Sequence, residues 1–330
     1  MPADTIRDVV VAQAIRTALL EEMRRDPSVF IMGEDIGVYG GVYGVTKGFL
    51  HEFGEGRVRD TPISEAALVA MTIGAAMVGM RPVVELMYAD FTAHAMDAIV
   101  NNAAKWRYMS GGQFSLPLVI RTPAGGGVGY AAQHSQCPEA WFAHVPGLKV
   151  MMPATPADMR GLLKSAIRDP NPVIFLEHKA IYDYKGPMPA EEYLTPIGVA
   201  DLKREGTDVT LVSWSKTLWD ARTAAERLAA EGISVEVVDP RTLQPLDSEA
   251  IFHSVHKTGR LVVAHEAVWF GGLGGEIVAQ VAAACFRELK SAPVRVGAKF
   301  LPQPFSPPLE QYVLPSVEDI MAAVKGALKS

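Results

Sequence analysis

The chain has 330 residues, enough for two domains that each bury a core of their own. A formal net charge of −6 and a pI near 5.8 give no electrostatic case for binding nucleic acid or an anionic membrane. Two cysteines are too few for a disulfide framework, so we expect a reducing, cytoplasmic compartment. No apolar run is long enough to span a membrane, and the charged N-terminus does not resemble a secretory signal.

In the first half of the chain, predicted helices alternate with predicted strands. The apolar spacing predicts helices over residues 5–25, 64–80 and 92–110. Strands are expected within residues 28–37, 81–91 and 116–127. Residues 148–178 have the pattern of strand, helix and strand, with a helix start at Thr155, Pro156 and Asp158. Strands that alternate with helices in this way predict a mostly parallel α/β sheet.

Residues 179–206 interrupt the alternation, because the segment KGPMPAEEYLTPIG holds three prolines and two glycines. The alternation then restarts. Strands are expected at residues 208–214, 233–239, 260–266 and 292–297. Helices are expected at residues 216–231, 247–258 and 316–328, with a glycine loop and helix at 271–289. We therefore expect two α/β domains, residues 1–190 and 207–330, joined by a linker at 191–206.

The predicted helix 64–80 is unusually apolar, because no charged residue lies between Glu65 and Arg81. A helix of this composition is expected to be packed on all sides. Glu65 has two interpretations. It can be a helix-start residue, with Ser64 as the cap and its charge favoured by the helix dipole. It can also be a half-buried carboxylate that is held to donate or accept one proton.

Other carboxylates lie near the predicted ends of strands, where α/β folds bind ligands. Glu34 and Asp35 follow the first strand in the stretch GEDIG and form either a solvated turn or part of a site. Glu85 and Asp90 lie on or after the strand that follows the apolar helix. If these side chains converge, they share protons.

The segment at residues 123–147, PAGGGVGYAAQHSQCPEAWFAHVPG, is the densest in candidate functional groups. Its glycines allow the backbone to approach a ligand, but they match a dinucleotide fingerprint only loosely. His134 and His144 are either general acids or bases or structural residues, and nothing supports Cys137 as a thiol nucleophile. The stretch WFGGLGGEI either binds an anion or makes a tight connection into a helix. The sequence contains no CxxC, HExxH, Walker A or GxSxG motif.

Several motifs, in order and with matching spacing, resemble one known family. They are TPISEAA, MSGG followed by LPLVIR, AAQHSQ, HVPGLKVMMP, GLLKSAIRDPNPVIFLEHKAIYD and VVDPRTLQPLD. Together they resemble the β subunit of the E1 component of 2-oxo acid dehydrogenase complexes, over roughly residues 5–325. EHKAIYD and VVDPRTLQPLD look most similar to acetoin dehydrogenase β subunits, followed by pyruvate dehydrogenase E1 β subunits.

The resemblance implies an N-terminal domain that binds the pyrimidine of thiamine diphosphate and a C-terminal transketolase-like domain. In that family the cofactor binds between subunits, and the Glu of the ISE motif, here Glu65, hydrogen-bonds N1′ of the aminopyrimidine. The C2 carbanion of the cofactor attacks the substrate carbonyl, and the thiazolium accepts electrons. On this interpretation the apolar helix behind Glu65 excludes water and strengthens that hydrogen bond.

The resemblance also implies roles for further residues. Ile63, Met87 and Phe91 would line the pyrimidine pocket, with Phe91 stacked near the ring. Glu34 would belong to a path of carboxylates that carries protons. His134 would face the channel and assist transfer to the lipoyl group. A structural K⁺ would be held by Leu118, Ala166, Ile167, Asp169 and Asn171.

The family's motif for Mg²⁺ and diphosphate begins GDG, and this sequence has no GDG. The chain would therefore supply only the pyrimidine half of the site. An E1 α subunit would hold the diphosphate and Mg²⁺ in an α2β2 heterotetramer, and the C-terminal domain would help to bind the subunit-binding domain of lipoyl-E2. His94 stands where many relatives carry a different polar residue. It is either a helix-surface residue or a channel-facing residue that tunes substrate choice.

The resemblance implies cleavage of acetoin or decarboxylation of a 2-oxo acid such as pyruvate, with acylation of lipoyl-E2. The substrate stays open, because one methylene in an apolar pocket changes discrimination by only about 1–3 kcal/mol. The alternatives are a branched-chain 2-oxo acid dehydrogenase, a transketolase-like carboligase that needs no E2, and a non-catalytic scaffold that binds E2. The presence of Glu65, Phe91 and His134 together favours an enzyme over the scaffold.

Overall fold

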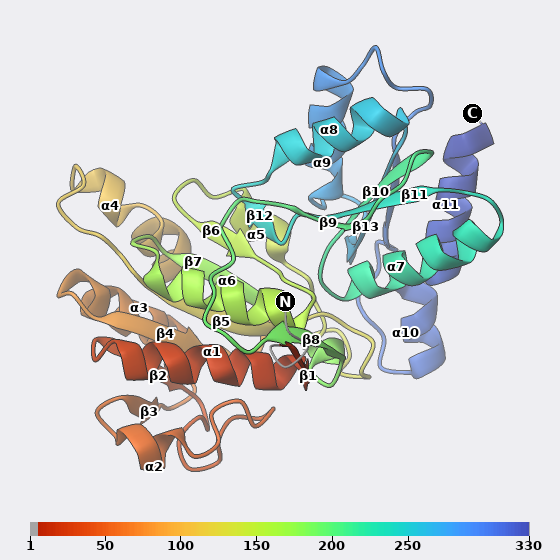
Figure 1. Ribbon diagram of the computed structural model, residues 1–330. Coiled ribbons are helices and arrows are strands. Elements are labelled where there is room, and N and C mark those ends of the chain that lie inside the picture. Colours follow the sequence, from red (N-terminus) through yellow and green to blue (C-terminus); the bar gives the residue numbers. More distant parts are fainter. Residues whose placement is uncertain (1–5, 330) are drawn as a thin grey trace. The chain divides into compact units, whose positions relative to one another are not determined.

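A computed structural model describes residues 6–329 (Figure 1). The chain divides into two compact units. Unit 1 contains the residues up to Ala124 together with Trp141–Ile197. Unit 2 contains Gly125–Ala140 together with the residues from Gly198 onward. The glycine-rich segment after residue 124 therefore folds with the C-terminal part of the chain.

Unit 1 is built on a parallel sheet, as the alternating pattern predicts. Its strands lie in the order β6, β7, β5, β4, β2, β3. Their bounds are β2 (Val29–Gly33), β3 (Val58–Asp60), β4 (Arg81–Glu85), β5 (Val119–Ala124), β6 (Lys149–Met151) and β7 (Val173–His178). Every residue of β2, β5 and β7 is buried, which is expected for strands covered on both faces.

The helices of unit 1 differ from the sequence prediction at residues 92–110. They are α1 (Val11–Arg25), α2 (Phe49–Phe53), α3 (Glu65–Met77) and α6 (Pro156–Arg168), with α5 (Glu139–Ala143) at the boundary in sequence and a short turn η4 (Lys179–Ile181). The single helix predicted at 92–110 is instead a 3-10 segment, a π segment and a short α-helix. These are η2 (Ala89–Ala95), η3 (Asp97–Ala103) and α4 (Trp106–Met109). Apolar spacing does not separate these helix types, because a segment of seven residues holds too few turns to define a period.

The helix predicted at 5–25 begins later than expected. Residues Ile6–Val10 form strand β1, which pairs antiparallel with β8 (Lys185–Pro189), and residue 5 lies outside the described part. The β-branched residues of this segment favour a strand, and its pairing partner is far away in sequence. Local periodicity therefore could not reveal the pairing.

The predicted start of α6 is confirmed. Thr155 is the N-cap residue, and its Oγ1 accepts a hydrogen bond from the Asp158 backbone N–H at 3.2 Å. Pro156 occupies the first helical position, where its missing N–H costs nothing. Further along this helix, Arg160 and Lys164 form ion pairs with Glu21 of α1 at 2.6 and 2.7 Å. These contacts fix α1 against α6.

Helix α3 is not packed on all sides, contrary to the prediction. Within this chain Met71 is 52% exposed, and Ile63 and Val78, which flank the helix, are 80% and 81% exposed. The small residues between them, Ala66, Ala67, Ala70 and Gly74, are exposed as well. The opposite face, with Leu68, Val69 and Ile73, is buried. An apolar composition indicates that a helix face is buried in the working protein. It does not indicate whether the same chain or a partner chain buries that face.

Unit 2 contains a second α/β sheet, so the predicted two-domain α/β fold is confirmed. Its strands lie in the order β14, β13, β10, β11, β9, and only β9 is antiparallel to its neighbour. The strands are β9 (Asp201–Arg204), β10 (Val209–Ser213), β11 (Val235–Asp239), β13 (Leu261–Val268) and β14 (Val294–Ala298), and the unit also holds the short β12 (Thr242–Gln244). Strand β9 falls within residues 191–206, which the sequence suggests as a linker.

Helices cover both faces of the unit 2 sheet. They are α7 (Ser215–Ala230), α8 (Ser248–Thr258), α9 (Gly274–Ala284), α10 (Pro307–Val313) and α11 (Val317–Lys329). Helices α7 and α11 pack together on one face, and α8 and α9 pack together on the other (Figure 1). Among residues 6–329 there is no helix of the length and apolarity that crossing a membrane requires.

Candidate active site

The carboxyl edge of the unit 1 sheet gathers acidic residues from several elements. Gly33, the last residue of β2, pairs with Glu85 of β4 on one side and with Asp60 of β3 on the other. A Cβ atom at Gly33 would lie 2.8 Å from the Glu85 carbonyl oxygen, so only glycine allows the strands to approach this closely. Glu34 follows directly, and strand ends of this kind are where α/β folds place ligands.

Glu65 is the first residue of α3 and is only 6% exposed. Ser64 stands at the N-cap, but its side chain makes no capping hydrogen bond. The Glu65 Oε2 atom lies 3.2 Å from His94 Nδ1. Among the described residues the carboxylate has no second hydrogen-bond partner. The helix dipole favours its charge, and the second oxygen remains available to a ligand.

Glu34 is the other candidate proton carrier at this edge. Burial raises the pKa of its carboxyl above the ordinary value, and the negative charges of Glu65, Asp35 and Glu85 raise it further. Its Oε1 atom is buried without a hydrogen-bond partner among residues 6–329. A buried carboxyl group with a raised pKa and an unpartnered oxygen is a candidate for proton transfer.

A buried network that the sequence analysis did not identify lies beside these residues. Arg121 of β5 donates two hydrogen bonds to Glu177 of β7, at 2.7 and 2.8 Å, and one to Glu85 at 2.8 Å. The Tyr182 hydroxyl donates to Glu177 at 2.7 Å. Glu85 is therefore paired with a guanidinium, although burial still raises the pKa of its carboxyl. An arginine within a strand as apolar as LPLVIRTPA was the available signal, because a buried arginine requires acidic partners.

The residues predicted to line the pyrimidine pocket differ in exposure. Phe91 and Met87 are half-buried, whereas Ile63 is exposed. The Phe91 ring lies 5.6 Å from the His94 ring, tilted by 38°. Beside them is a groove of about 360 Å³, lined by Ala66, Ala70, Ile73, His94, Asp97, Ala98 and Asn102. Of the residues singled out from the sequence, only His94 lines this groove.

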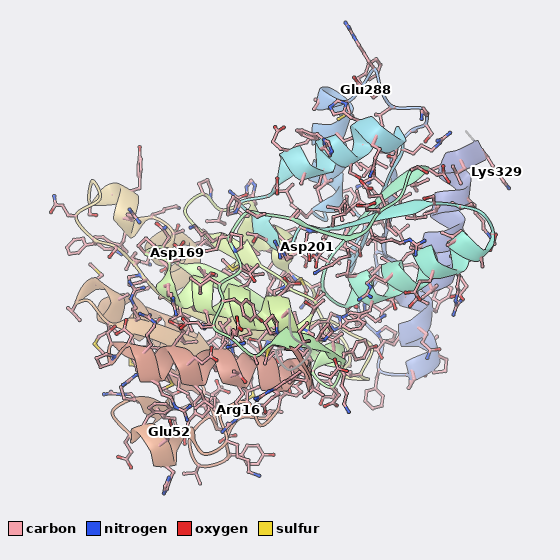
Figure 2. The ribbon with its side chains drawn as sticks, viewed as in Figure 1. Arg16, Glu52, Asp169, Asp201, Glu288 and Lys329 are labelled. Carbon is pink, nitrogen blue, oxygen red and sulfur yellow. The ribbon has the colours of Figure 1, made fainter. Side chains whose placement is uncertain are left out.

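The residues predicted to hold K⁺ lie around the turn between α6 and β7, where Asp169 is labelled in Figure 2. Their oxygens already have partners. The Ile167 carbonyl accepts a hydrogen bond from Arg81 at 2.8 Å, and Lys149 pairs with the Asp169 carboxylate. The carbonyls of Leu118 and Ala166 each accept one backbone N–H. A cation would have to use the second lone pairs of these carbonyls, since the side chain of Asp169 is neutralised.

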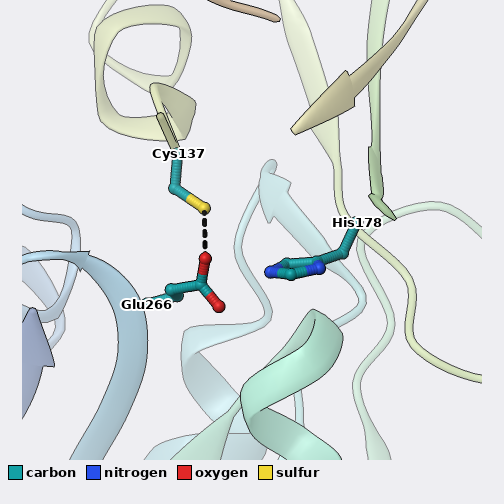
Figure 3. Close-up of side chains that lie close together, drawn as sticks. All are labelled: Cys137, His178 and Glu266. Carbon is teal, nitrogen blue, oxygen red and sulfur yellow. Dashed lines mark hydrogen bonds between the residues drawn. The ribbon is translucent and has the colours of Figure 1, made fainter. Parts of the chain in front are cut away.

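The backbone amides of the glycine loop after β5 donate hydrogen bonds to carboxylates of unit 2. The backbone N–H of Gly126 donates to Glu266 at 2.7 Å, and those of Gly127 and Gly129 donate to Glu310 at 2.7 and 3.1 Å. Figure 3 shows the Cys137 thiol directed at Glu266, with Sγ 3.7 Å from Oε1. These amides are used to fix the segment to unit 2, which explains the glycines without a bound dinucleotide.

His134 lies in the same segment and therefore belongs to unit 2, whereas Glu65 belongs to unit 1. Its side chain is half-buried. Glu139, at the end of the segment, is fully buried, and burial raises the pKa of its carboxyl to about 8. The neighbouring charge of Glu266 acts in the same direction. Glu139 is a second perturbed carboxyl that sequence reasoning did not single out.

The glycines that open α9 are explained by packing. A Cβ atom at Gly272 or Gly274 would lie 2.6 or 2.7 Å from the ring of His265. His265 is buried and stacks on Trp214, with ring centroids 5.1 Å apart. Burial lowers the pKa of this histidine to about 4, so the ring is neutral at physiological pH. The stretch WFGGLGGEI is therefore a tight strand-to-helix connection around an imidazole.

Comparison with known proteins places these features in a family. The model of the transketolase pyrimidine-binding domain matches residues 7–185, and that of the transketolase C-terminal domain matches residues 198–320. A solved structure titled "Split gene transketolase, inactive beta4 tetramer" superposes with a TM-score of 0.80 at 26% identity, covering 97% of this chain and 98% of the other. The two units are thus a transketolase-type pair of domains.

Relatives of known sequence are more similar still. The pyruvate dehydrogenase E1 component subunit beta-2 of Oryza sativa is 47% identical over 97% of this chain and 86% of its own length. The 2-oxoisovalerate dehydrogenase subunit beta of Bacillus subtilis is 46% identical over 94% of this chain and 96% of its own. The beta subunit of acetoin:2,6-dichlorophenolindophenol oxidoreductase from Cupriavidus necator is 46% identical over 98% of both chains. The chain belongs to the family of β subunits of the E1 components of 2-oxo acid and acetoin dehydrogenases, which are oxidoreductases.

Proposed function

We propose that this chain is the β subunit of a thiamine-diphosphate-dependent dehydrogenase and supplies the pyrimidine half of the cofactor site. The observation that carries the proposal is Glu65. Its carboxylate is almost fully buried at the first residue of α3, yet only one of its oxygens has a hydrogen-bond partner among the described residues. The second oxygen can form a hydrogen bond with a ring nitrogen of the cofactor's pyrimidine.

Each neighbouring residue has a role in this proposal. Glu65 would hold a proton between its carboxylate and N1′ of the aminopyrimidine, and bound thiamine diphosphate would supply the nucleophilic carbon and the electron sink of the reaction. Phe91, Met87 and Ile63 contact the pyrimidine, and the buried residues behind α3 keep water from the carboxylate. Glu34, whose carboxyl has a raised pKa, passes protons along the acidic edge.

The partner proposed for unit 1 is an E1 α subunit. The sequence has no GDG motif to hold Mg²⁺ and diphosphate. The apolar face of α3 is exposed within this chain, and Ile63, which precedes the helix, is exposed as well. An α subunit that covers this face would complete the site in an α2β2 assembly and would bring the Mg²⁺. A structural K⁺ at Leu118, Ala166, Ile167, Asp169 and Asn171 remains part of the proposal.

The proposed reaction acylates lipoyl-E2 from acetoin or from a 2-oxo acid such as pyruvate. Here His134 assists transfer to the lipoyl group, and residues 207–330 help to bind the subunit-binding domain of E2. Identities of 46–47% to pyruvate, 2-oxoisovalerate and acetoin enzymes do not choose among these substrates. A branched-chain 2-oxo acid is therefore the alternative substrate, and turnover without E2 would indicate a carboligase instead.

Calorimetric titration with Mg²⁺–thiamine diphosphate tests the half-site. The chain alone should bind weakly or not at all, and the chain co-expressed with its α partner should bind with a defined stoichiometry. Tight binding by the chain alone would show that the diphosphate is held here and would overturn the proposed assembly. A screen of acetoin, pyruvate and branched-chain 2-oxo acids on the complex then identifies the substrate.

A further inference from the structure

His94 and Glu65 come from different elements and meet at one contact. His94 lies in η2 and Glu65 begins α3, and the His94 Nδ1 to Glu65 Oε2 distance is 3.2 Å. No other side chain among the described residues hydrogen-bonds the Glu65 carboxylate. The orientation of this carboxylate therefore depends on one imidazole.

The two partners differ sharply in exposure. The side chain of His94 is 63% exposed, whereas that of Glu65 is 7% exposed. The imidazole thus reaches the buried carboxylate from the open side, beside the Phe91 ring and the groove lined by Ala66 and Ala70. A side chain this exposed contributes little to the core. Its hydrogen bond to Glu65 is therefore its main polar interaction.

A carboxylate that must face one ring nitrogen gains from being held in one orientation. When Nδ1 carries the proton, it donates to Oε2 and leaves Oε1 for the ligand. Among the described residues, neither Glu34 nor Glu85 on the strand ends hydrogen-bonds Glu65. A carboxylate that is already held in one orientation loses less conformational entropy when the ligand binds.

We propose that His94 is a positioning residue for Glu65, holding Oε2 so that Oε1 faces N1′ of the cofactor's pyrimidine. The proposal rests on the cofactor role of Glu65 proposed above. It goes beyond that role by making the orientation of Glu65 depend on a hydrogen-bond donor at position 94. It also assigns the groove side of η2 a function in cofactor binding rather than in substrate choice.

Three variants of the assembled α–β protein test the proposal. His94→Leu removes the donor at similar bulk, His94→Gln keeps an N–H donor, and His51→Leu is the control at an exposed histidine of α2. The probes are Mg²⁺–thiamine diphosphate and its analogue in which N1′ is replaced by CH, each titrated calorimetrically. The His94→Leu variant should bind the natural cofactor about tenfold more weakly, because a hydrogen bond to a charged group is lost.

The analogue separates positioning from packing. It cannot use the Glu65 contact, so His94→Leu should bind it as tightly as the unaltered protein does. His94→Gln should stay within about threefold for the natural cofactor, and His51→Leu should match the unaltered protein for both compounds.

Three results would overturn the proposal: no loss in His94→Leu, equal losses for both compounds, or His94→Gln as weak as His94→Leu. Glu65→Gln distinguishes the underlying role. If that variant, loaded with cofactor, keeps the unaltered rate of C2–H/D exchange, the proposed function of Glu65 fails and the role of His94 fails with it.

Discussion

Arg121 and Glu177 are joined by two parallel hydrogen bonds between neighbouring strands of the unit 1 sheet, at 2.7 and 2.8 Å. Both side chains are almost fully buried, and Glu85 and Tyr182 complete the network. Glu85 of this network pairs across the sheet with Gly33, the residue before Glu34. The network therefore joins β4, β5 and β7 through buried charged groups.

Arg121→Met should destabilise the protein by about 3–5 kcal/mol, because it leaves two buried carboxylates without their cation. The measurement is the free energy of urea unfolding, monitored by circular dichroism. The matched control is Arg24→Met, which breaks the exposed Arg24–Glu52 pair and should cost at most about 1 kcal/mol. Equal losses of unfolding free energy in the two variants would contradict a stabilising role for the Arg121 network.

Glu139→Gln should change how stability depends on pH. Burial raises the pKa of Glu139 from its ordinary value of 4.5 to about 8. Between these values the folded state binds a proton that the unfolded state lacks, so stability falls as pH rises, by about 1.4 kcal/mol per unit. Glutamine stays neutral and removes this loss.

The free energy of unfolding of the Glu139→Gln variant relative to the unaltered protein should therefore rise from pH 4.5 and level off above pH 8. Urea unfolding between pH 5 and pH 9 measures it. Glu226→Gln, at an exposed position of α7, controls for the removal of one negative charge. Parallel stability curves for Glu139→Gln and the unaltered protein would contradict the assignment.

Thr155→Ala should cost about 1 kcal/mol, because Thr155 caps α6 by accepting the Asp158 N–H. Ser64→Ala is the control at the start of α3, where the side chain makes no capping hydrogen bond, and its cost should be less than about 0.5 kcal/mol. Differential scanning calorimetry of both variants compares the two caps. A larger loss at Ser64 would reverse the interpretation of both helix starts.

The sequence predicted the features that depend on local pattern. Alternating helices and strands indicated two parallel-rich α/β sheets, and the Thr155 start of α6 followed from its capping residues. Contacts between distant segments could not be predicted. Strand β1 pairs with residues near 187, and Arg121 finds its partner 56 residues away. Nothing local encodes either pairing.

The site was predicted in part for the same reason. Glu65 was identified by motif, but its contact with His94 joins η2 to α3 across 29 residues. The glycines after β5 indicated a close approach of the backbone to a ligand. The structure instead provides Glu266 and Glu310, from more than 100 residues further along, as the acceptors of their amides. The type of a residue indicates that it requires a hydrogen-bond partner, but it does not identify which residue that partner is.

The role of Glu65 is the central claim, and C2–H/D exchange of bound thiamine diphosphate tests it most directly. The exchange rate is measured by NMR in the assembled α–β protein for the unaltered chain and for Glu65→Gln, with cofactor occupancy confirmed in both. The account predicts intact assembly and exchange slowed by at least about a hundredfold in Glu65→Gln. Exchange at the unaltered rate in a loaded Glu65→Gln variant would contradict it.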